Sequence, residues 1–226
     1  METRRYPKRV TLISNLIHNR EAIMLYSPTG VGKTWLSLSI AMMVAGKGQL
    51  EVLDWENKDP QPVCYVDGEM LEEDMQERIK MLIPSLNVDE EELRKNFRYL
   101  SRVSQKEEIE DFLSLELKEN QLELLKWLKD NSGKGKHPLL VLDNLSNLAE
   151  LGDENSSGQM QSFNMMVTKA RKFGCSIVTV HHTGKSMTHG PDGIPTWRGS
   201  YDMATRLDKT NCLLPCKSSH DGYVTF

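Results

Sequence analysis

The sequence predicts an α/β fold in which a mainly parallel central sheet is flanked by helices to give three layers. Apolar runs of strand length alternate with amphipathic runs of helix length, which is the pattern of a parallel sheet wrapped by helices. The apolar runs are rich in Val, Ile and Leu without polar alternation, as in strands buried on both faces. The chain has 226 residues, which suits one such domain and leaves little room for a second core.

Strands are predicted where short apolar runs occur between polar or turn-forming residues. They cover Ala22–Tyr26, Val63–Val66, Phe97–Leu100, Leu139–Leu142 and Ser176–Val180. Helices are predicted over the longer amphipathic segments, several of which have apolar residues at i, i+3 and i+4. They cover Lys33–Val44, Leu71–Leu82, Glu107–Lys118, Gln121–Lys129 and Gln159–Lys172. Surface loops are predicted over 131–137, rich in Gly and Lys, and over 183–197, which holds several Gly and Pro residues.

Residues 1–226 are predicted to form a single domain. Residues 1–21 form an N-terminal segment ahead of the first predicted strand. Residues 211–226 are predicted to form a C-terminal hairpin that turns around Ser218–Gly222. Its last strand ends abruptly at Phe226, so we expect the chain to be cut short there.

The charge balance excludes a strongly basic nucleic-acid-binding protein. The chain has 28 Lys and Arg residues against 32 Asp and Glu residues, a formal net charge of −4, so any DNA contact must come from local loops. The four cysteines have neither CxxC nor zinc-site spacing and are predicted to be reduced thiols of a cytoplasmic protein. No apolar run reaches the length of a membrane span and no signal peptide is recognisable, so we expect no membrane partner.

A phosphate-binding motif lies between the first predicted strand and the first predicted helix. The segment 27–34 matches GxxxxGK[ST], except that Ser27 stands where the first Gly is usual. A second Gly-Lys-Ser triplet at 184–186 is not followed by a segment that can begin a helix, so context selects the first. The predicted nucleotide-binding residues are Ser27, Pro28, Thr29, Gly30, Val31, Gly32, Lys33, Thr34 and Trp35.

The chemistry of a triphosphate explains these residue types. Gly30 and Gly32 let backbone N–H groups and the positive end of a helix approach the phosphates. Lys33 would neutralise the β- and γ-phosphates, and the Thr34 hydroxyl would bind Mg²⁺. ATP and Mg²⁺ are therefore the predicted substrate and cofactor. The alternative is a strand-to-helix turn with no ligand.

Two acidic residues follow apolar strands, at the edge where open parallel sheets bind ligands. Asp143 ends the strand Leu139–Leu142 and is the metal candidate, because an Asp beside a phosphate-binding loop holds the metal or its water. Glu69 follows Val63–Val66 after two further residues and is the candidate base. Each acid could instead be a helix cap or a solvated turn residue.

The strand Ser176–Val180 leads into His181 and His182, whose side chains must point to opposite faces. Only one can face a nucleotide, and we assign a γ-phosphate-sensing role to His182 in preference to a hydrogen-bonded structural role. A metal site is disfavoured because no third ligand has suitable spacing. Arg198 and Arg206 are candidates for an arginine that acts at a neighbouring subunit's site, with surface ion pairing as the alternative.

Together these motifs resemble RecA-like P-loop ATPases of the kind found in hexameric plasmid and mobile-element replicative helicases. The resemblance covers residues 22–226. It implies that the His182 strand lies between the Ser27 and Asp143 strands, that Glu69 activates water, and that Arg198 or Arg206 acts in trans. It further implies a homo-oligomeric ring, which we expect to be hexameric. Loops after Asp143 and after His182 would face the ring centre and grip single-stranded DNA.

The leading hypothesis is therefore an oligomeric ATPase that moves on single-stranded DNA as a helicase or translocase, in replication of a bacterial or mobile element. The first alternative is an ATP-switched regulatory or interaction module of the same class without DNA unwinding, which the net negative charge favours. A small-molecule kinase is a third interpretation, and the placement of Glu69 and His182 disfavours it. Trp197 is interpreted as a packing or subunit-contact residue, with stacking on a base as the alternative.

Overall fold

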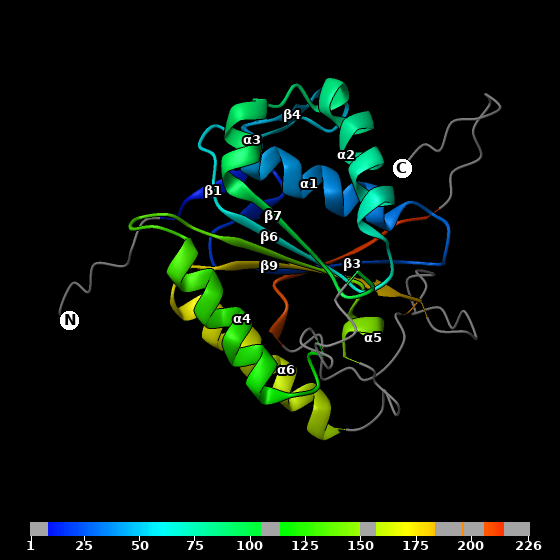
Figure 1. Ribbon diagram of the computed structural model, residues 1–226, viewed down its shortest axis with the longest axis vertical. Coiled ribbons are helices and arrows are strands. Elements are labelled where there is room, and N and C mark those ends of the chain that lie inside the picture. Colours follow the sequence, from blue (N-terminus) through cyan, green and yellow to red (C-terminus); the bar gives the residue numbers. More distant parts are fainter. Residues whose placement is uncertain (1–8, 105–113, 150–156, 184–195, 197–205, 215–226) are drawn as a thin grey trace.

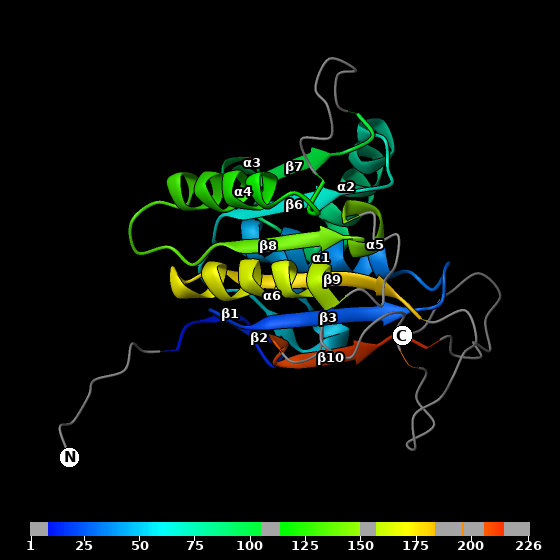
Figure 2. The same ribbon diagram turned by 90° about the horizontal axis from the view of Figure 1, so that it is seen from below.

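Six strands form the central sheet in the order β10-β3-β9-β8-β6-β7, and every neighbouring pair is parallel (Figures 1 and 2). The computed structural model describes residues 9–104, 114–149, 157–183, 196 and 206–214. The sheet strands are β3 (Ala22–Ser27), β6 (Val63–Asp67), β7 (Phe97–Ser101), β8 (Leu139–Asp143), β9 (Ser176–His182) and β10 (Lys209–Cys212). The predicted position of the His182 strand, between the Ser27 and Asp143 strands, is confirmed.

Helices cover both faces of this sheet. On one face lie α1 (Lys33–Gly46), α2 (Glu72–Leu86) and α3 (Glu90–Asn96), and on the other lie α4 (Lys118–Asn131) and α6 (Ser157–Lys172) (Figure 1). The short helix α5 (Leu145–Leu148) follows β8 directly. The predicted three-layer α/β fold with a parallel sheet is confirmed.

Successive residues of each strand point to opposite faces of the sheet, and each face packs into its own apolar core. Both sets of residues are therefore apolar, which explains the continuous apolar runs in the sequence. In β8, Leu139 and Val141 pack on the α1 side, while Leu140 and Leu142 pack on the α4–α6 side. All four side chains are fully buried. A strand with solvent on one face would have shown polar alternation instead.

Two small antiparallel sheets complete the described structure. The first pairs β1 (Thr11–Ile13) with β2 (Ile17–His18), so the predicted N-terminal segment contains a hairpin whose Leu12, Ile13 and Ile17 are fully buried. The second pairs β4 (Gln49–Leu50) with β5 (Trp55–Glu56) around a 3-10 turn, η1 (Glu51–Leu53). Strands this short carry weak sequence signals, because two or three residues cannot establish a period.

Several predicted boundaries are wrong. The predicted helix over 107–118 does not reach its stated end, because Leu117 is extended and α4 begins at Lys118; its first residues lie outside the described ranges. The helix α2 continues past its predicted end at Leu82, through Pro84, to the buried Leu86. Asn211 and Cys212, predicted to start a hairpin, lie in an edge strand parallel to β3. The rest of that predicted hairpin, 215–226, lies outside the described residues.

Truncating a side chain in the second core should destabilise the fold. Leu140→Ala removes a fully buried side chain between the sheet and α4–α6, and we expect it to lower the free energy of unfolding by about 2–5 kcal/mol. Urea unfolding measures the change. As a control, Leu122→Ala on the exposed side of α4 should change the free energy by less than about 0.5 kcal/mol; equal losses would contradict the assigned core.

Candidate nucleotide-binding site

Four parallel strands end at one edge of the sheet with a polar residue. Ser27 lies opposite His182 in the β3–β9 pair, and Asp67 lies opposite Asp143 in the β6–β8 pair. The order β3-β9-β8-β6 makes these four ends neighbours. The predicted site residues that follow the strands, Lys33 and Glu69 among them, are therefore brought to the same edge as Asp143.

The loop between β3 and α1 has the backbone that phosphate binding requires. Gly30 has φ 83° and Gly32 has φ 101°, a region that residues with a Cβ rarely adopt. The helix α1 begins at Lys33 with Gly32 as its N-cap, and no side chain caps its first N–H groups. Free N–H groups at the start of a 14-residue helix form an anion site.

Lys33 is buried, with 6% of its surface exposed, and its ammonium group contacts the loop itself. Nζ donates to the backbone oxygens of Ser27 at 3.0 Å and Pro28 at 2.9 Å, and to Ser27 Oγ at 3.1 Å. Burial lowers the pKa of Lys33, and the charges of Asp143 and Glu69 oppose that shift. Ser27 has no positive φ, so a serine fits at the usual Gly position and supplies a hydroxyl to Lys33.

Asp143 is 4% exposed and belongs to a buried hydrogen-bond network. The Tyr65 hydroxyl donates to its Oδ2 at 2.6 Å, and Ser37 Oγ lies 3.4 Å from the same atom and 2.8 Å from the Tyr65 hydroxyl. Burial raises the pKa of Asp143, while hydrogen bonds from Tyr65 and Thr34 lower it. These contacts place the Thr34 hydroxyl beside the Asp143 carboxylate.

This pair of oxygen donors fits Mg²⁺. In the described part of the chain no three His, Cys, Asp or Glu side chains gather as a metal site, but Mg²⁺ bound with a nucleotide needs only one or two protein oxygens beside phosphates and waters. Thr34 and Asp143 would hold it here. Its charge would then help to neutralise the phosphates.

Glu69 lies in a tight turn after β6. Asp67 Oδ1 accepts hydrogen bonds from the backbone N–H groups of Glu69 and Met70, both at 2.7 Å, and the Ser101 hydroxyl donates to the Met70 backbone oxygen at 2.8 Å. His182 lowers the pKa of Glu69 most, with a further contribution from Asn144, and partial burial opposes both. The turn thus presents a half-exposed carboxylate beside His182, whose Nε2 lies 4.0 Å from Glu69 Oε1.

The two histidines at the end of β9 have different surroundings. His182 Nε2 lies 3.1 Å from Asn144 Nδ2, on the Glu69 side. His181 is fully buried, and its Nδ1 lies 3.3 Å from the Ser146 hydroxyl of α5. Of the pair, His182 is the one whose side chain lies beside Glu69.

The sequence profile of the AAA domain family matches residues 2–187 of the chain. The chain belongs to this AAA domain family. Its members are P-loop ATPases, and the matched residues 2–187 include the loop 27–34 and the two acids Glu69 and Asp143. No curated protein matches the sequence. No helix among the described residues has the length and apolar composition to cross a membrane.

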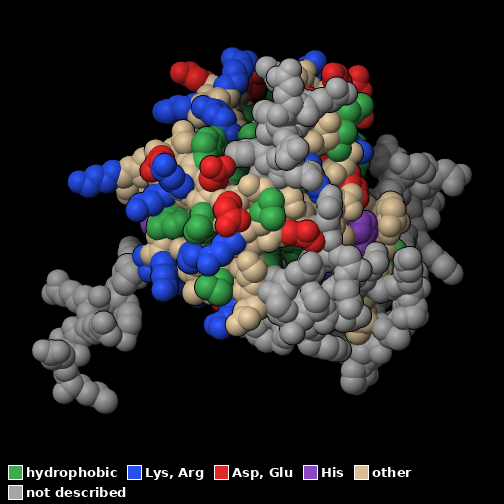
Figure 3. All heavy atoms as spheres, turned by 60° about the horizontal axis from the view of Figure 1, so that its bottom comes forward, with side chains coloured by type: hydrophobic (Ala, Val, Ile, Leu, Met, Phe, Trp, Pro, Cys, Tyr) green, Lys and Arg blue, Asp and Glu red, His purple; other side chains and the backbone are tan. Residues whose placement is uncertain are grey.

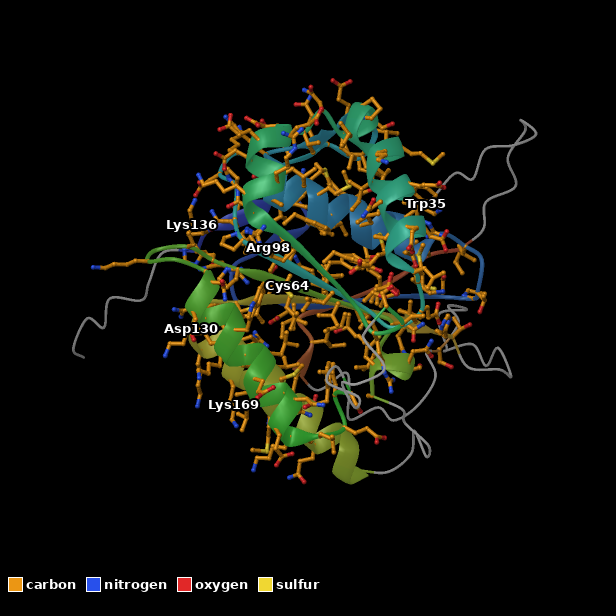
Figure 4. All side chains as sticks on the ribbon, in the orientation of Figure 1. Trp35, Cys64, Arg98, Asp130, Lys136 and Lys169 are labelled. Carbon is orange, nitrogen blue, oxygen red and sulfur yellow. The ribbon has the colours of Figure 1, made fainter. Side chains whose placement is uncertain are left out.

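The structure describes two of the three remaining predicted site residues of this AAA domain, Arg206 and Trp35. Arg198 lies outside the described residues. Arg206 is exposed, its backbone oxygen accepts from Arg171 Nη1 at 3.0 Å, and it precedes β10 at the amino edge of the sheet, opposite Lys33. Trp35 stays at the nucleotide edge near the start of α1 (Figure 4), where its ring packs under the Arg78 guanidinium at 4.8 Å.

Sequence reasoning missed five polar residues of the site: Ser37, Tyr65, Asp67, Asn144 and Asn147. Ser37 lies one turn after Lys33, so helical spacing from the loop could have identified it. Tyr65 lies two residues before Asp67 in β6, so both side chains point to the same face of the sheet. Its spacing does not reveal the contact with Asp143, because that contact joins β6 to β8. Asn144 follows Asp143 directly, yet its contact with Glu69 depends on two separate strands.

Asp67 should make stability depend on pH. Burial raises its pKa from 3.8 to about 6, so its ionisation is disfavoured in the folded state. The stability that the neutral acid contributes is full below pH 4 and is lost as pH rises through about 6, by at most about 3 kcal/mol. Asp67→Asn keeps the acceptor oxygen and cannot ionise, so the variant should gain stability relative to the parent over this range. Urea unfolding at several pH values measures the difference between the two proteins; a constant difference contradicts the assignment.

Proposed function

We propose that this AAA domain hydrolyses ATP as a subunit of an oligomeric motor, a helicase or translocase that acts on single-stranded DNA. The observation that supports hydrolysis best is the position of Glu69. It follows β6, the strand beside β8, and faces the same edge as Lys33 and Asp143. A carboxylate there can orient water toward the γ-phosphate, while the loop and α1 hold the phosphates.

Each residue has a distinct part in the proposed reaction. Lys33 and the N–H groups at the start of α1 bind the β- and γ-phosphates and offset the charge that develops on them. Glu69 accepts a proton from the attacking water as the water oxygen bonds to the γ-phosphorus and the bond from that phosphorus to the β-phosphate oxygen breaks, which releases ADP and phosphate. His182 lies within reach of Glu69 through Asn144, so a contact between His182 and the γ-phosphate would affect the base.

An oligomer is proposed because the resemblance implies an arginine supplied by a neighbouring subunit, whereas Arg102, which follows β7 at this subunit's own phosphate edge, already donates to the Asn147 backbone oxygen. Arg206 lies at the opposite edge, so any action on a phosphate would be at a neighbour's site. Arg198 is the other candidate. A neighbouring arginine would stabilise the transition-state charge and make turnover depend on assembly.

The DNA-binding part of the proposal rests on chain connectivity. The segments after β8 and β9 leave the sheet at the nucleotide edge, next to Glu69 and His182 respectively. If residues of these two segments bind DNA, they are connected through a few residues of the chain to the side chains beside the phosphate. Lys185 in the second segment is the basic residue nearest to His182 in sequence.

The second candidate function is an ATP-switched interaction module, and surface charge favours it. The formal net charge is −4. Among the described side chains of the face formed by α4 and α6, acidic groups lie among the basic ones (Figure 3). Such a surface does not attract a polyanion from a distance. The two functions differ in whether DNA changes turnover.

Replacing Glu69 should separate binding from hydrolysis. Glu69→Gln removes the base but keeps the shape of the side chain, so we expect kcat to fall by about 100-fold or more while nucleotide affinity is retained. Lys33→Ala should instead lose nucleotide affinity. A fluorescent ATP analogue and a phosphate-release assay measure the two properties. Glu73→Gln, an exposed residue of α2, is the matched control; normal turnover of Glu69→Gln would remove the proposed base.

Single-stranded DNA should stimulate ATP hydrolysis. We expect a higher turnover with DNA than without it, and the DNA concentration needed should rise steeply with salt because phosphate contacts release counterions. Phosphate release across a salt series, with oligomeric state recorded in parallel by light scattering, tests this. Stimulation that is absent at every salt concentration favours the interaction module.

A further inference from the structure

The Glu69 carboxylate is held at one oxygen only, as far as the described residues go. Oε1 accepts hydrogen bonds from Asn144 Nδ2 at 2.6 Å and Asn147 Nδ2 at 2.8 Å. No residue in the described ranges donates to Oε2. Two amides therefore anchor one oxygen and leave the other to accept a hydrogen bond from a ligand.

Neighbouring hydrogen bonds determine how the Asn144 amide is oriented. Its Oδ1 accepts from the Asn147 backbone N–H at 3.1 Å, and a backbone N–H can only donate. The Nδ2 group is consequently the one that faces Glu69 Oε1 and His182 Nε2. Asn144 is 2% exposed and is the N-cap of α5, so this orientation is enforced by its surroundings.

The second amide is fixed by the position of α5. Asn147 lies in α5, and its backbone oxygen accepts from the Arg102 guanidinium. The backbone oxygen of Leu148 accepts from the Leu115 N–H at 2.6 Å. The helix also packs closely on the turn that carries Glu69, because a Cβ at Gly68 would lie 3.0 Å from the Asn147 Cβ.

Structural needs explain only part of this arrangement. The N-cap role of Asn144 uses its Oδ1 and leaves the Nδ2 donor without a capping function. Asn147 is exposed, so packing does not require its side chain. Glu69 is the partner that the two donors share.

We propose that Asn144 and Asn147 are positioning residues that fix the Glu69 carboxylate, so that α5 sets the rate of the hydrolytic step. The proposal rests on Glu69 being the base of the proposed function. With Oε1 anchored, rotation of the carboxylate breaks two hydrogen bonds, and Oε2 stays aimed at the attacking water.

Two variants test the proposal without removing the cap. Asn147→Ala deletes one donor, and Asn144→Asp keeps the N-cap oxygen while deleting the other. We expect each to lower kcat by about 10- to 100-fold, the usual cost of a misplaced catalytic group, with KM and the affinity for a fluorescent ATP analogue unchanged. Asn147→Gln retains an amide on an exposed side chain and should recover part of the loss. Asn131→Ala, an exposed asparagine at the far end of α4, is the control and should keep the parental kcat.

A double-variant measurement distinguishes this proposal from the function on which it rests. Adding Asn147→Ala to Glu69→Gln should cause no further loss of kcat, because the amide acts through Glu69. Unchanged or increased kcat in Asn147→Ala and Asn144→Asp, with Glu69→Gln inactive, would overturn the positioning role and leave Glu69 as the base. Equal losses of kcat and nucleotide affinity would show a structural role instead and would also overturn it. Normal turnover of Glu69→Gln overturns the proposed function itself.

Discussion

Parallel pairing of β3, β9, β8 and β6 is the constraint on which the site depends. Parallel strands have their carboxyl ends at one edge, and the observed register places Ser27 beside His182 and Asp67 beside Asp143. Ser27 and His182 are more than 150 positions apart in the chain and become neighbours through the backbone pairing of β3 with β9. The two apolar cores hold that register, because a slip by one residue would move every inward side chain to the other face.

The polar groups at this edge compensate one another within a buried setting. Lys33 and Asp143 are each almost inaccessible to solvent. Burial lowers the pKa of Lys33 and raises the pKa of Asp143, so it favours the neutral form of each. Each has hydrogen-bond partners that favour the charged form: loop oxygens for Lys33, and the Tyr65 hydroxyl for Asp143. A triphosphate and its metal bring charges of both signs into such a site, and prearranged dipoles reduce the reorganisation that their binding requires.

Glu69, the proposed base, is held by contacts from three directions. Asp67 fixes the backbone of the turn, Ser101 of β7 fixes its far side, and the two asparagines of the α5 segment hold the side chain. Only the last of these contacts comes from an element that follows β8 and precedes a connecting segment. The Glu69 side chain is therefore tied to the residues of the α5 segment, whereas Lys33 contacts its own loop.

The α/β class, the phosphate-binding loop and the two acids could be predicted from the sequence alone, because each depends on local signals: apolar run length, glycines that permit positive φ, and a carboxylate at or just after the end of a strand. It could not reveal the Tyr65–Asp143 contact or the amides on Glu69, since each joins residues from separate strands whose order and register are set by packing. It also misplaced the end of α2, where the buried Leu86 outweighs the local preference of Pro84. Which polar side chains meet became clear from the folded arrangement, because hydrogen bonds across a sheet depend on the relative position of whole strands.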